Sequence, residues 1–437
     1  MIIVFIAFYI QGLVCSILKG ALWFSDNIAI VSYIIVFLTS IVFSLYVLYC
    51  HKCCNSSSNV HSGFSKYVTI IILIGYFIRL FLIIWDVYFA SVFPLPHSGA
   101  DTERFFGQAV EMYTGNLEQG GMLYSSFLNS VFQLFGIQRI VAQYYNVLFG
   151  VSSVLIALKI LGKYKVDEFT KKVFITIGML IPDYAVLNSI LLRESIIVFL
   201  LTGSLFFFVT WVQDNRFIGF IFSIVLSLIA AAFHSGLIAV AIGYATCPVL
   251  FDRRKDRFRF SKTTVFLVIC CVFVCFVIIN QSGDLFTMKF SDVDAIEDIT
   301  EFVSVARGGS AYSALITTGN TVVDIIISTP LRVFYFTMSP LPWDWRGLND
   351  IIAFVFSSVF YGYCYYLAFK TLRSPLCKNW ELITSLLFII SLSTFVFAWG
   401  VGNAGTALRH RDKLFIPCLL MFSFCIEKRE KQTYNGL

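Results

Sequence analysis

The chain has 437 residues, of which 58% are hydrophobic and only 13% charged, and its formal net charge is +6. Soluble domains carry about 25% charged residues and rarely expose large apolar patches, so this composition excludes a soluble globular protein. Repeated apolar runs of about 20 residues instead predict an all-α, polytopic helical membrane protein. Lys and Arg of such a protein gather in its inner loops, so the positive charge does not indicate nucleic acid binding.

Three spans are predicted in the first part of the chain, over residues 1–17, 28–50 and 67–88. The first lacks a basic leading region and a small-residue cleavage site, so we expect it to be retained. The third contains Arg79 and Asp86, which are seven residues apart and therefore share one helix face. An ionisable pair inside a membrane helix indicates either a functional site or a structural ion pair facing the bundle.

The first large polar region covers residues 91–138 and contains the sequence Asp101-Thr102-Glu103-Arg104. Charged residues are scarce in this chain, so two acids and a base within four residues are unusual. We predict that Asp101 and Glu103 serve acid/base chemistry in an outer loop, although a solvated, merely charged loop is the alternative. Residues 122–135 are apolar but short, and predict an interfacial or re-entrant helix.

The middle of the chain continues with apolar runs. Further spans are predicted over 140–161, 173–191, 195–212 and 263–280. Arg193 and Glu194 fall between two of these spans. Residues 217–250 are too long for one span, and predict a hairpin of two spans with its bend at His234-Ser235-Gly236.

The second large polar region covers residues 281–348 and includes Arg307 and Arg346. Its apolar part, 321–338, is interrupted by Pro330 and predicts a re-entrant segment. Three more spans, over 351–369, 382–399 and 414–426, bring the total to about twelve.

The loop predicted over residues 400–413 carries Arg409, His410 and Arg411.

The distribution of Lys and Arg predicts the orientation of a single transmembrane domain covering residues 1–437. Basic clusters lie at 159–172, 253–262, 370–378 and 428–431. Twelve spans place all four clusters and both termini inside, and place 91–138, 281–348 and 400–413 outside. Arg409 and Arg411 then lie on the side that basic residues usually avoid, and anionic ligand groups would supply a reason.

No P-loop, dinucleotide fingerprint, zinc motif or nucleophile elbow occurs in the chain. An enzyme without a nucleotide site and with its polar residues outside would draw an activated substrate from the lipid. Arg is suited to a diphosphate leaving group, because its planar fork binds phosphate oxygens bidentately. We predict no cofactor. The single Asp-x-Glu motif leaves the need for a divalent metal open.

Several motifs resemble those of membrane glycosyltransferases of the GT-C type. The acidic first outer loop with Asp101 and Glu103 is similar to theirs, as is Gly121-Met122-Leu123-Tyr124 before an apolar helix. Ile181-Pro182, followed by residues 188–194, resembles their mid-chain span pair, and Arg409-His410-Arg411 before Pro417 resembles their last basic loop. The spacing from Arg193 to Phe233-His234-Ser235 is similar to that in repeat-unit polymerases of bacterial surface polysaccharides, the O-antigen polymerase (Wzy) and EpsG-like proteins.

This resemblance implies a GT-C-like fold and a polymerase in the bacterial inner membrane. Such an enzyme transfers a growing glycan from undecaprenyl diphosphate to the next lipid-linked oligosaccharide unit on the periplasmic side. A chain-length regulator and other polysaccharide assembly proteins are possible partners.

The resemblance also implies roles for residues. Asp101 or Glu103 would be the base, His234 would orient groups or relay a proton, and Arg193, Arg409 and Arg411 would hold the diphosphate. The remaining expected substrate-binding residues are Arg104, Glu194, Arg307, Arg346 and His410.

Two other functions stay open. One is a GT-C transferase that adds a single sugar from a polyprenyl-phosphate donor. The other is a transporter or flippase without enzymatic activity. Transporters usually contain internal repeats and broken helices that face the membrane midplane. The absence of a clear repeat and the gathering of charge on one face favour an enzyme.

Overall fold

The computed structural model describes residues 2–18, 27–55, 62–116, 122–214, 216–252, 257–258, 312, 316, 318, 321–374, 377 and 379–427. The predicted span 263–280, most of the basic segment 253–262 and the polar segment 281–311 with Arg307 lie outside the described residues. Within those residues the fold is helical, apart from two short paired strands, β1 (Phe251–Asp252) and β2 (Arg257–Phe258).

Helices follow the apolar runs, because a helix satisfies its own backbone polar groups where water is absent. The α-helices up to residue 250 are α1 (Ile2–Leu18), α3 (Ile28–Asn55), α4 (Ser62–Tyr88), α5 (Ala100–Thr114), α6 (Leu123–Phe135), α7 (Arg139–Lys163), α8 (Glu168–Leu180), α9 (Pro182–Leu187), α10 (Glu194–Asp214), α11 (Phe217–Phe233) and α12 (Ile238–Leu250). Those that follow are α16 (Thr321–Met338), α17 (Leu348–Ala353), α18 (Val359–Leu372), α19 (Trp380–Trp399), α20 (Ala404–Asp412) and α21 (Phe415–Ile426). Shorter turns are η1 (Ser235–Leu237), η2 (Pro342–Asp344) and the π-helical η3 (Phe354–Ser358).

Six of the described helical segments are long and apolar enough to cross a membrane. They are Ile28–Cys50, Lys66–Tyr88, Arg139–Lys163, Glu194–Asp214, Leu348–Leu372 and Trp380–Trp399. Four apolar helices are shorter: Ile2–Leu18, Phe217–Phe233, Ser235–Cys247 and Phe415–Ile426. This is the pattern of a polytopic helical membrane protein, while the total of twelve spans stays a prediction.

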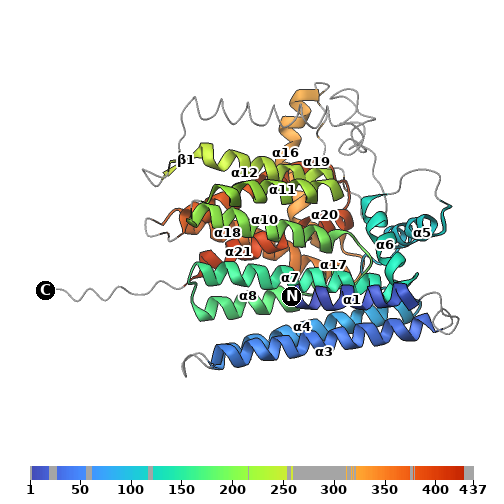
Figure 1. The fold of residues 1–437 in the computed structure, drawn as a ribbon. Helices are drawn as coiled ribbons and strands as arrows, with labels where there is room; N and C mark the ends of the chain where they lie inside the picture. Colours follow the sequence, from blue (N-terminus) through green and yellow to red (C-terminus); the bar gives the residue numbers. More distant parts are fainter. Residues whose placement is uncertain are drawn as a thin grey trace.

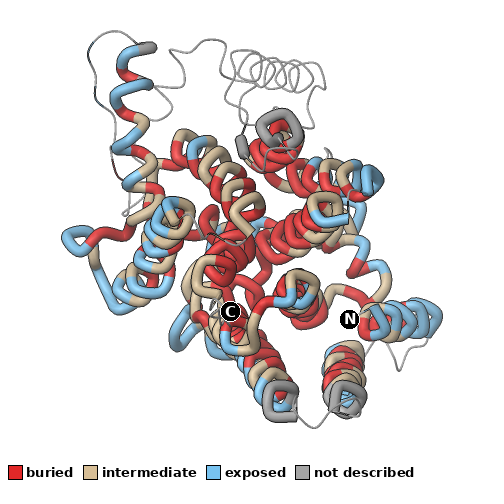
Figure 2. Tube along the Cα trace, turned by 90° about the vertical axis from the view of Figure 1, so that its left-hand side faces the viewer, coloured by how far each residue is buried: buried red, intermediate tan, exposed pale blue. Residues whose placement is uncertain are grey.

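Buried residues gather in the middle of the bundle, and exposed residues lie on its outlying helices (Figure 2). In the span of α7 67% of the residues are buried, against 28% in the span of α3. The helix α7 is therefore central, and α3 presents a mostly apolar outer face of the kind that suits lipid.

One predicted span is wrong in detail. Residues 173–191 do not form one helix, because α8 ends at Leu180 and α9 begins at Pro182. Pro182 has no N–H to donate to the carbonyl of Gly178, and it favours an extended conformation at Ile181, where φ is −61° and ψ is 126°. In contrast, the bend predicted at His234-Ser235-Gly236 is confirmed, with extended backbone at His234 between α11 and η1, while the crossing of the membrane by both arms stays a prediction.

Two regions predicted as loops are helical. Asp101, Glu103 and Arg104 lie in the first turn of α5, where acidic side chains interact favourably with the positive end of the helix dipole. Residues 404–412 form α20, because the Asn403 side chain caps the helix by accepting a hydrogen bond of 2.7 Å from the Thr406 N–H.

The bundle has two chemically different ends. At one end, here called the Asp101 end, α5 lies beside the start of α7 and beside α20 through ion pairs of Glu103 with Arg139 and of Asp101 with Arg409. At the other, the Lys163 end, Lys163 pairs with Asp214 at 2.8 Å. The residues predicted to lie outside, among those described, gather at the Asp101 end, as expected if that end faces outward.

The helix α16 runs steeply across the direction of most other helices (orange in Figure 1). It is not among the six segments long and apolar enough to span. Its orientation agrees with the prediction that residues 321–338 do not cross the membrane, and its interior Pro330 fits an interrupted segment.

We predict that the Asp101 end faces outward. Ser98→Cys and Gly402→Cys lie at this end, and a side chain at Gly402 meets open space. Both should react with a membrane-impermeant maleimide in intact cells, whereas Lys165→Cys at the Lys163 end should react only after permeabilisation. The control is the parent protein with its accessible native Cys removed. Labelling of Lys165→Cys in intact cells would reverse the orientation.

Candidate functional site

Asp101 connects α5 to α20, although the two helices are 300 residues apart in the sequence. Its Oδ2 atom accepts a hydrogen bond of 2.6 Å from Nη1 of Arg409, whose side chain is only 18% exposed. Its Oδ1 atom lies 3.4 Å from Nη2 of Arg104, one turn further along α5. One carboxylate thus lies between two guanidinium groups at the Asp101 end.

A third guanidinium joins them from the segment between α9 and α10. Nη1 of Arg193 donates to the carbonyl of Phe233 at 2.9 Å, and its guanidinium carbon lies 5.8 Å from the centre of the Phe105 ring. Arg193 thereby meets both the bend after α11 and the first turns of α5.

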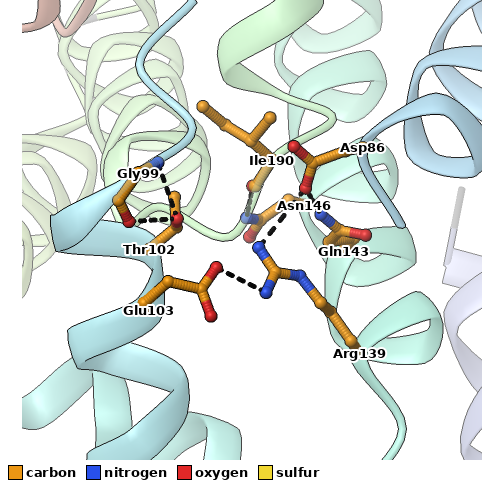
Figure 3. Close-up of polar contacts among 8 residues, drawn as sticks. All are labelled: Asp86, Gly99, Thr102, Glu103, Arg139, Gln143, Asn146 and Ile190. Atoms are coloured by element: carbon orange, nitrogen blue, oxygen red, sulfur yellow. Dashed lines mark hydrogen bonds and ion pairs between the residues drawn. The ribbon is translucent and has the colours of Figure 1, made fainter. Parts of the chain in front are cut away.

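The irregular segment before Arg193 is held by a buried amide. Nδ2 of Asn146 donates to the carbonyl of Ile190 at 2.7 Å (Figure 3). It also donates to the carbonyl of Leu192 at 2.9 Å. These carbonyls follow the break at Pro182. The Ile190 carbonyl also accepts from the Leu192 N–H at 2.9 Å. The amide adds to this turn and fixes the path of the chain into Arg193.

Glu194 and Lys413 form a buried ion pair beneath these groups. The Nζ atom of Lys413 lies 3.5 Å from Oε1 of Glu194, and the two side chains are 0% and 6% exposed. Two charges this deep are retained only when each is near opposite charge.

Two imidazoles also meet here. The rings of His234 and His410 are 4.5 Å apart and nearly perpendicular, and Phe397 packs against both at 5.5 and 5.1 Å. The predicted bend at His234 and the basic motif around His410 therefore contribute adjacent side chains.

The charges around Asp101 set its protonation. Burial alone would raise the pKa of Asp101, but Arg409, Arg104 and Arg193 outweigh burial and hold this pKa below its ordinary value. Burial and the positive charge of Arg409 lower the pKa of His97 to about 4. At neutral pH the site therefore contains an ionised Asp101 and an uncharged His97.

Arg193 and Arg409 retain hydrogen-bonding capacity. Each uses one Nη1 atom on a protein acceptor, and their other guanidinium N–H groups have no acceptor among the described residues. Guanidinium groups with free donors can bind phosphate oxygens, so the group formed by Arg193, Arg409 and Arg104 is a candidate anion site.

Three of the described site residues predicted from the sequence lie elsewhere. Glu103 points to Arg139 at 2.6 Å, and the exposed Arg346 lies 3.9 Å from Asp350. Arg307 lies outside the described residues.

The third of these, Arg411, is buried, and its guanidinium donates to three backbone carbonyls at the end of α16, those of Phe336, Thr337 and Ser339. The structure therefore does not bring the Arg411 guanidinium to the anion site, although Arg411 is only two residues from Arg409.

The predicted pairing of Arg79 with Asp86 is also wrong. Arg79 donates to the carbonyls of Gly75 and Met179, whereas Asp86 accepts from Gln143 and Arg139. A shared helix face brings residues seven apart to the same side, but neighbouring helices here offer each of them nearer partners.

Sequence reasoning missed His97, Arg139 and Lys413. Lys413 directly follows the basic motif, and its position there was the available signal. His97 lies only four residues before Asp101 in the same polar region, and this closeness was the available signal. Arg139 stands alone beside an apolar run, and nothing in its local sequence separates it from an ordinary interfacial residue.

Compared with protein-family models and with curated proteins, the chain matches none. Within the described residues, no three His, Cys, Asp or Glu side chains gather as a candidate metal site.

We predict that Lys413→Met destabilises the protein. Removing one member of a buried ion pair costs about 3–5 kcal/mol, and we expect the lower end of this range because Arg193 and Arg409 remain near Glu194. Thermal unfolding of the detergent-solubilised protein should show a lower midpoint. Glu194→Gln combined with Lys413→Met removes both charges and should recover part of the loss. An unchanged midpoint for Lys413→Met would contradict the ion pair.

Proposed function

We propose that this protein is a membrane glycosyltransferase of the polymerase type. It would join undecaprenyl-diphosphate-linked oligosaccharide units of O-antigen or a related surface polysaccharide at the Asp101 end, on the periplasmic side of the bacterial inner membrane. The observation that carries the proposal is the positive charge around Asp101: Arg409 pairs with its carboxylate, and Arg193, which also keeps free donors, lies near enough to lower the pKa of Asp101.

The reaction makes two demands that these side chains can meet. The bond between the sugar and the diphosphate breaks, and its electrons leave with the diphosphate, so negative charge develops on the leaving group. Fixed guanidinium groups stabilise that charge without reorganising. Meanwhile a hydroxyl of the acceptor unit attacks the sugar carbon and must lose its proton to a base within hydrogen-bond reach.

Asp101 is the better candidate for this base, because Glu103 points away to Arg139. In the unliganded protein, the pairing with Arg409 makes Asp101 a weak base. A bound diphosphate brings negative charge beside Asp101 and competes for Arg409, and both effects raise the proton affinity of the carboxylate. Binding of the donor would therefore prepare the base for the acceptor.

The neighbouring imidazoles suit a supporting role. His234 and His410 lie behind the anion site and in contact with each other, where they can orient the diphosphate or relay a proton. The acidic and basic residues would thus act as one assembly contributed by α5, α10, α20 and the bend after α11.

Deletion of the gene tests the reaction class. The lipid-linked glycans of the deletion strain should be complete single units, and polymer should return with the wild-type gene. Truncated units would instead indicate a transferase that adds one sugar. Unchanged surface polysaccharide would reject both enzymatic proposals.

We predict that Asp101→Asn lowers polymer formation by about 100-fold or more, since general base catalysis contributes about 10²–10⁴-fold. The substitution keeps the side-chain shape, so abundance in the membrane should stay normal. Polymer length and amount on gels, normalised to protein in the membrane, provide the measurement. Full polymer from Asp101→Asn would remove the base from the proposal.

We predict that Arg193→Lys and Arg409→Lys each lower polymer formation at least tenfold at normal abundance, because Lys keeps the charge but not the bidentate fork. Arg411→Lys should instead lower abundance, since it disrupts the contacts with three carbonyls. Arg216→Lys, an exposed position at the Lys163 end, is the matched control and should be neutral. Normal polymer from both Arg193→Lys and Arg409→Lys would argue against a diphosphate site.

A further inference from the structure

The helix α5 carries Asp101 but has few attachments to the bundle. It packs mainly on α6, through Phe105 against Tyr124 and Phe106 against Phe132. In Figure 1 these two helices lie together at one end of the molecule. Beyond α6, charged side chains provide α5 with contacts to the rest of the bundle.

Two of these contacts are ion pairs on opposite sides of α5. Asp101 and Glu103 are two residues apart, which is roughly 200° around a helix of 3.6 residues per turn. Asp101 pairs with Arg409 of α20, and Glu103 pairs with Arg139 at the start of α7. Together the two pairs fix the rotation of α5, and so the direction in which Asp101 points.

Arg139 is itself held firmly. While Nη1 donates to Glu103 at 2.6 Å, Nη2 lies 3.4 Å from Oδ2 of Asp86, a carboxylate that is 0% exposed. Nε2 of Gln143, one turn along α7, donates to the same oxygen at 2.5 Å (Figure 3). The guanidinium also lies over the Phe106 ring at 5.7 Å. A buried anion on α4 thus anchors a cation that reaches out to α5.

We propose that Arg139 and Glu103 are positioning residues of the site: Arg139, anchored by Asp86, holds Glu103 and thereby aims Asp101 at Arg409 and Arg193. This inference rests on the proposed function for its effect on polymer, but not for its effect on α5. In this proposal Glu103, the second acid of the Asp-x-Glu motif, positions Asp101 and takes no part in proton transfer.

The alternative is an ion pair that only stabilises the fold. Exposed ion pairs contribute little to stability, and the Glu103 side chain is 59% exposed. Glu103→Gln should therefore leave stability and abundance nearly unchanged. A positioning role instead predicts a lower turnover rate from this substitution.

A double-mutant cycle on polymer formation separates the two. We expect Glu103→Gln and Arg139→Gln each to lower the turnover rate about five- to tenfold, with a smaller change in KM. The double variant should be no worse than Arg139→Gln alone, because both substitutions break the same ion pair. Arg139→Gln leaves the buried carboxylate of Asp86 without its cation, which destabilises the protein. Asp86→Asn combined with Arg139→Gln removes both charges and therefore tests the loss of positioning without that cost. Lys163→Gln and Asp214→Asn remove an ion pair at the opposite end of α7 and form the matched control. The inference would be overturned if the rate losses of the two single variants multiply in the double variant, or if Glu103→Gln causes no loss of turnover rate.

A spectroscopic distance measures α5 without any substrate. Spin labels at Glu111→Cys on α5 and Leu348→Cys on α17, both exposed positions, report the distance between α5 and the bundle in purified protein from which reactive native Cys have been removed. Glu103→Gln and Arg139→Gln should each broaden or shift the distribution in the same way, and the control pair should not. Unchanged distributions would overturn the positioning role. A shifted α5 in a protein without polymerase activity would uphold this inference while rejecting the proposed function.

Discussion

Helices that stop inside the bundle impose the constraint on which this structure depends. The last carbonyls of a helix have no partner within it, and a membrane interior offers no water to satisfy them. Here buried and partly buried arginines meet that need. Arg79 donates to the end of α8, Arg193 to the end of α11, Arg332 to the end of α19, and Arg411 to the end of α16.

This arrangement suits arginine for two physical reasons. A guanidinium carries five N–H donors in one plane and accepts nothing, so it can serve several carbonyls at once, as Arg411 serves three. Its positive charge also faces the negative end of the helix dipole, which offsets part of the cost of burial. The breaks at Pro182 and His234 are therefore tolerated within an apolar bundle.

Arginine thus has two roles in this protein, as a donor to helix-end carbonyls and as a candidate ligand for an anion. Only the fold shows which arginine has which role. Arg409 and Arg411 belong to one short motif, but α20 turns them roughly 200° apart. Arg409 faces Asp101 with free donors, whereas both terminal nitrogens of Arg411 donate to carbonyls at the end of α16. The sequence predicted that the motif lies near the site, but no local pattern states which arginine has its donors occupied.

The fold was predictable where hydrophobic length and breaking residues act locally. The apolar runs predicted the long spans, and His234-Ser235-Gly236 predicted the bend of the hairpin. The start of α5 and the whole of α20 were missed, because their polar composition is that of a loop and their helices depend on caps and on ion pairs with distant segments. Asp101, Arg193, His234 and Arg409 were each predicted singly, whereas the role of Glu103 depends on Arg139 and Asp86, which lie in other helices.

The short length of α20 has a mechanical consequence. With nine residues it extends only about 14 Å, and Arg409 and Arg411 are separated by about 3 Å along its axis. Arg411 is attached to the end of α16, which crosses the bundle, and Arg409 is attached to the carboxylate on α5. A displacement of α16 would therefore act through α20 on the ion pair between Arg409 and Asp101, and so on the carboxylate of α5.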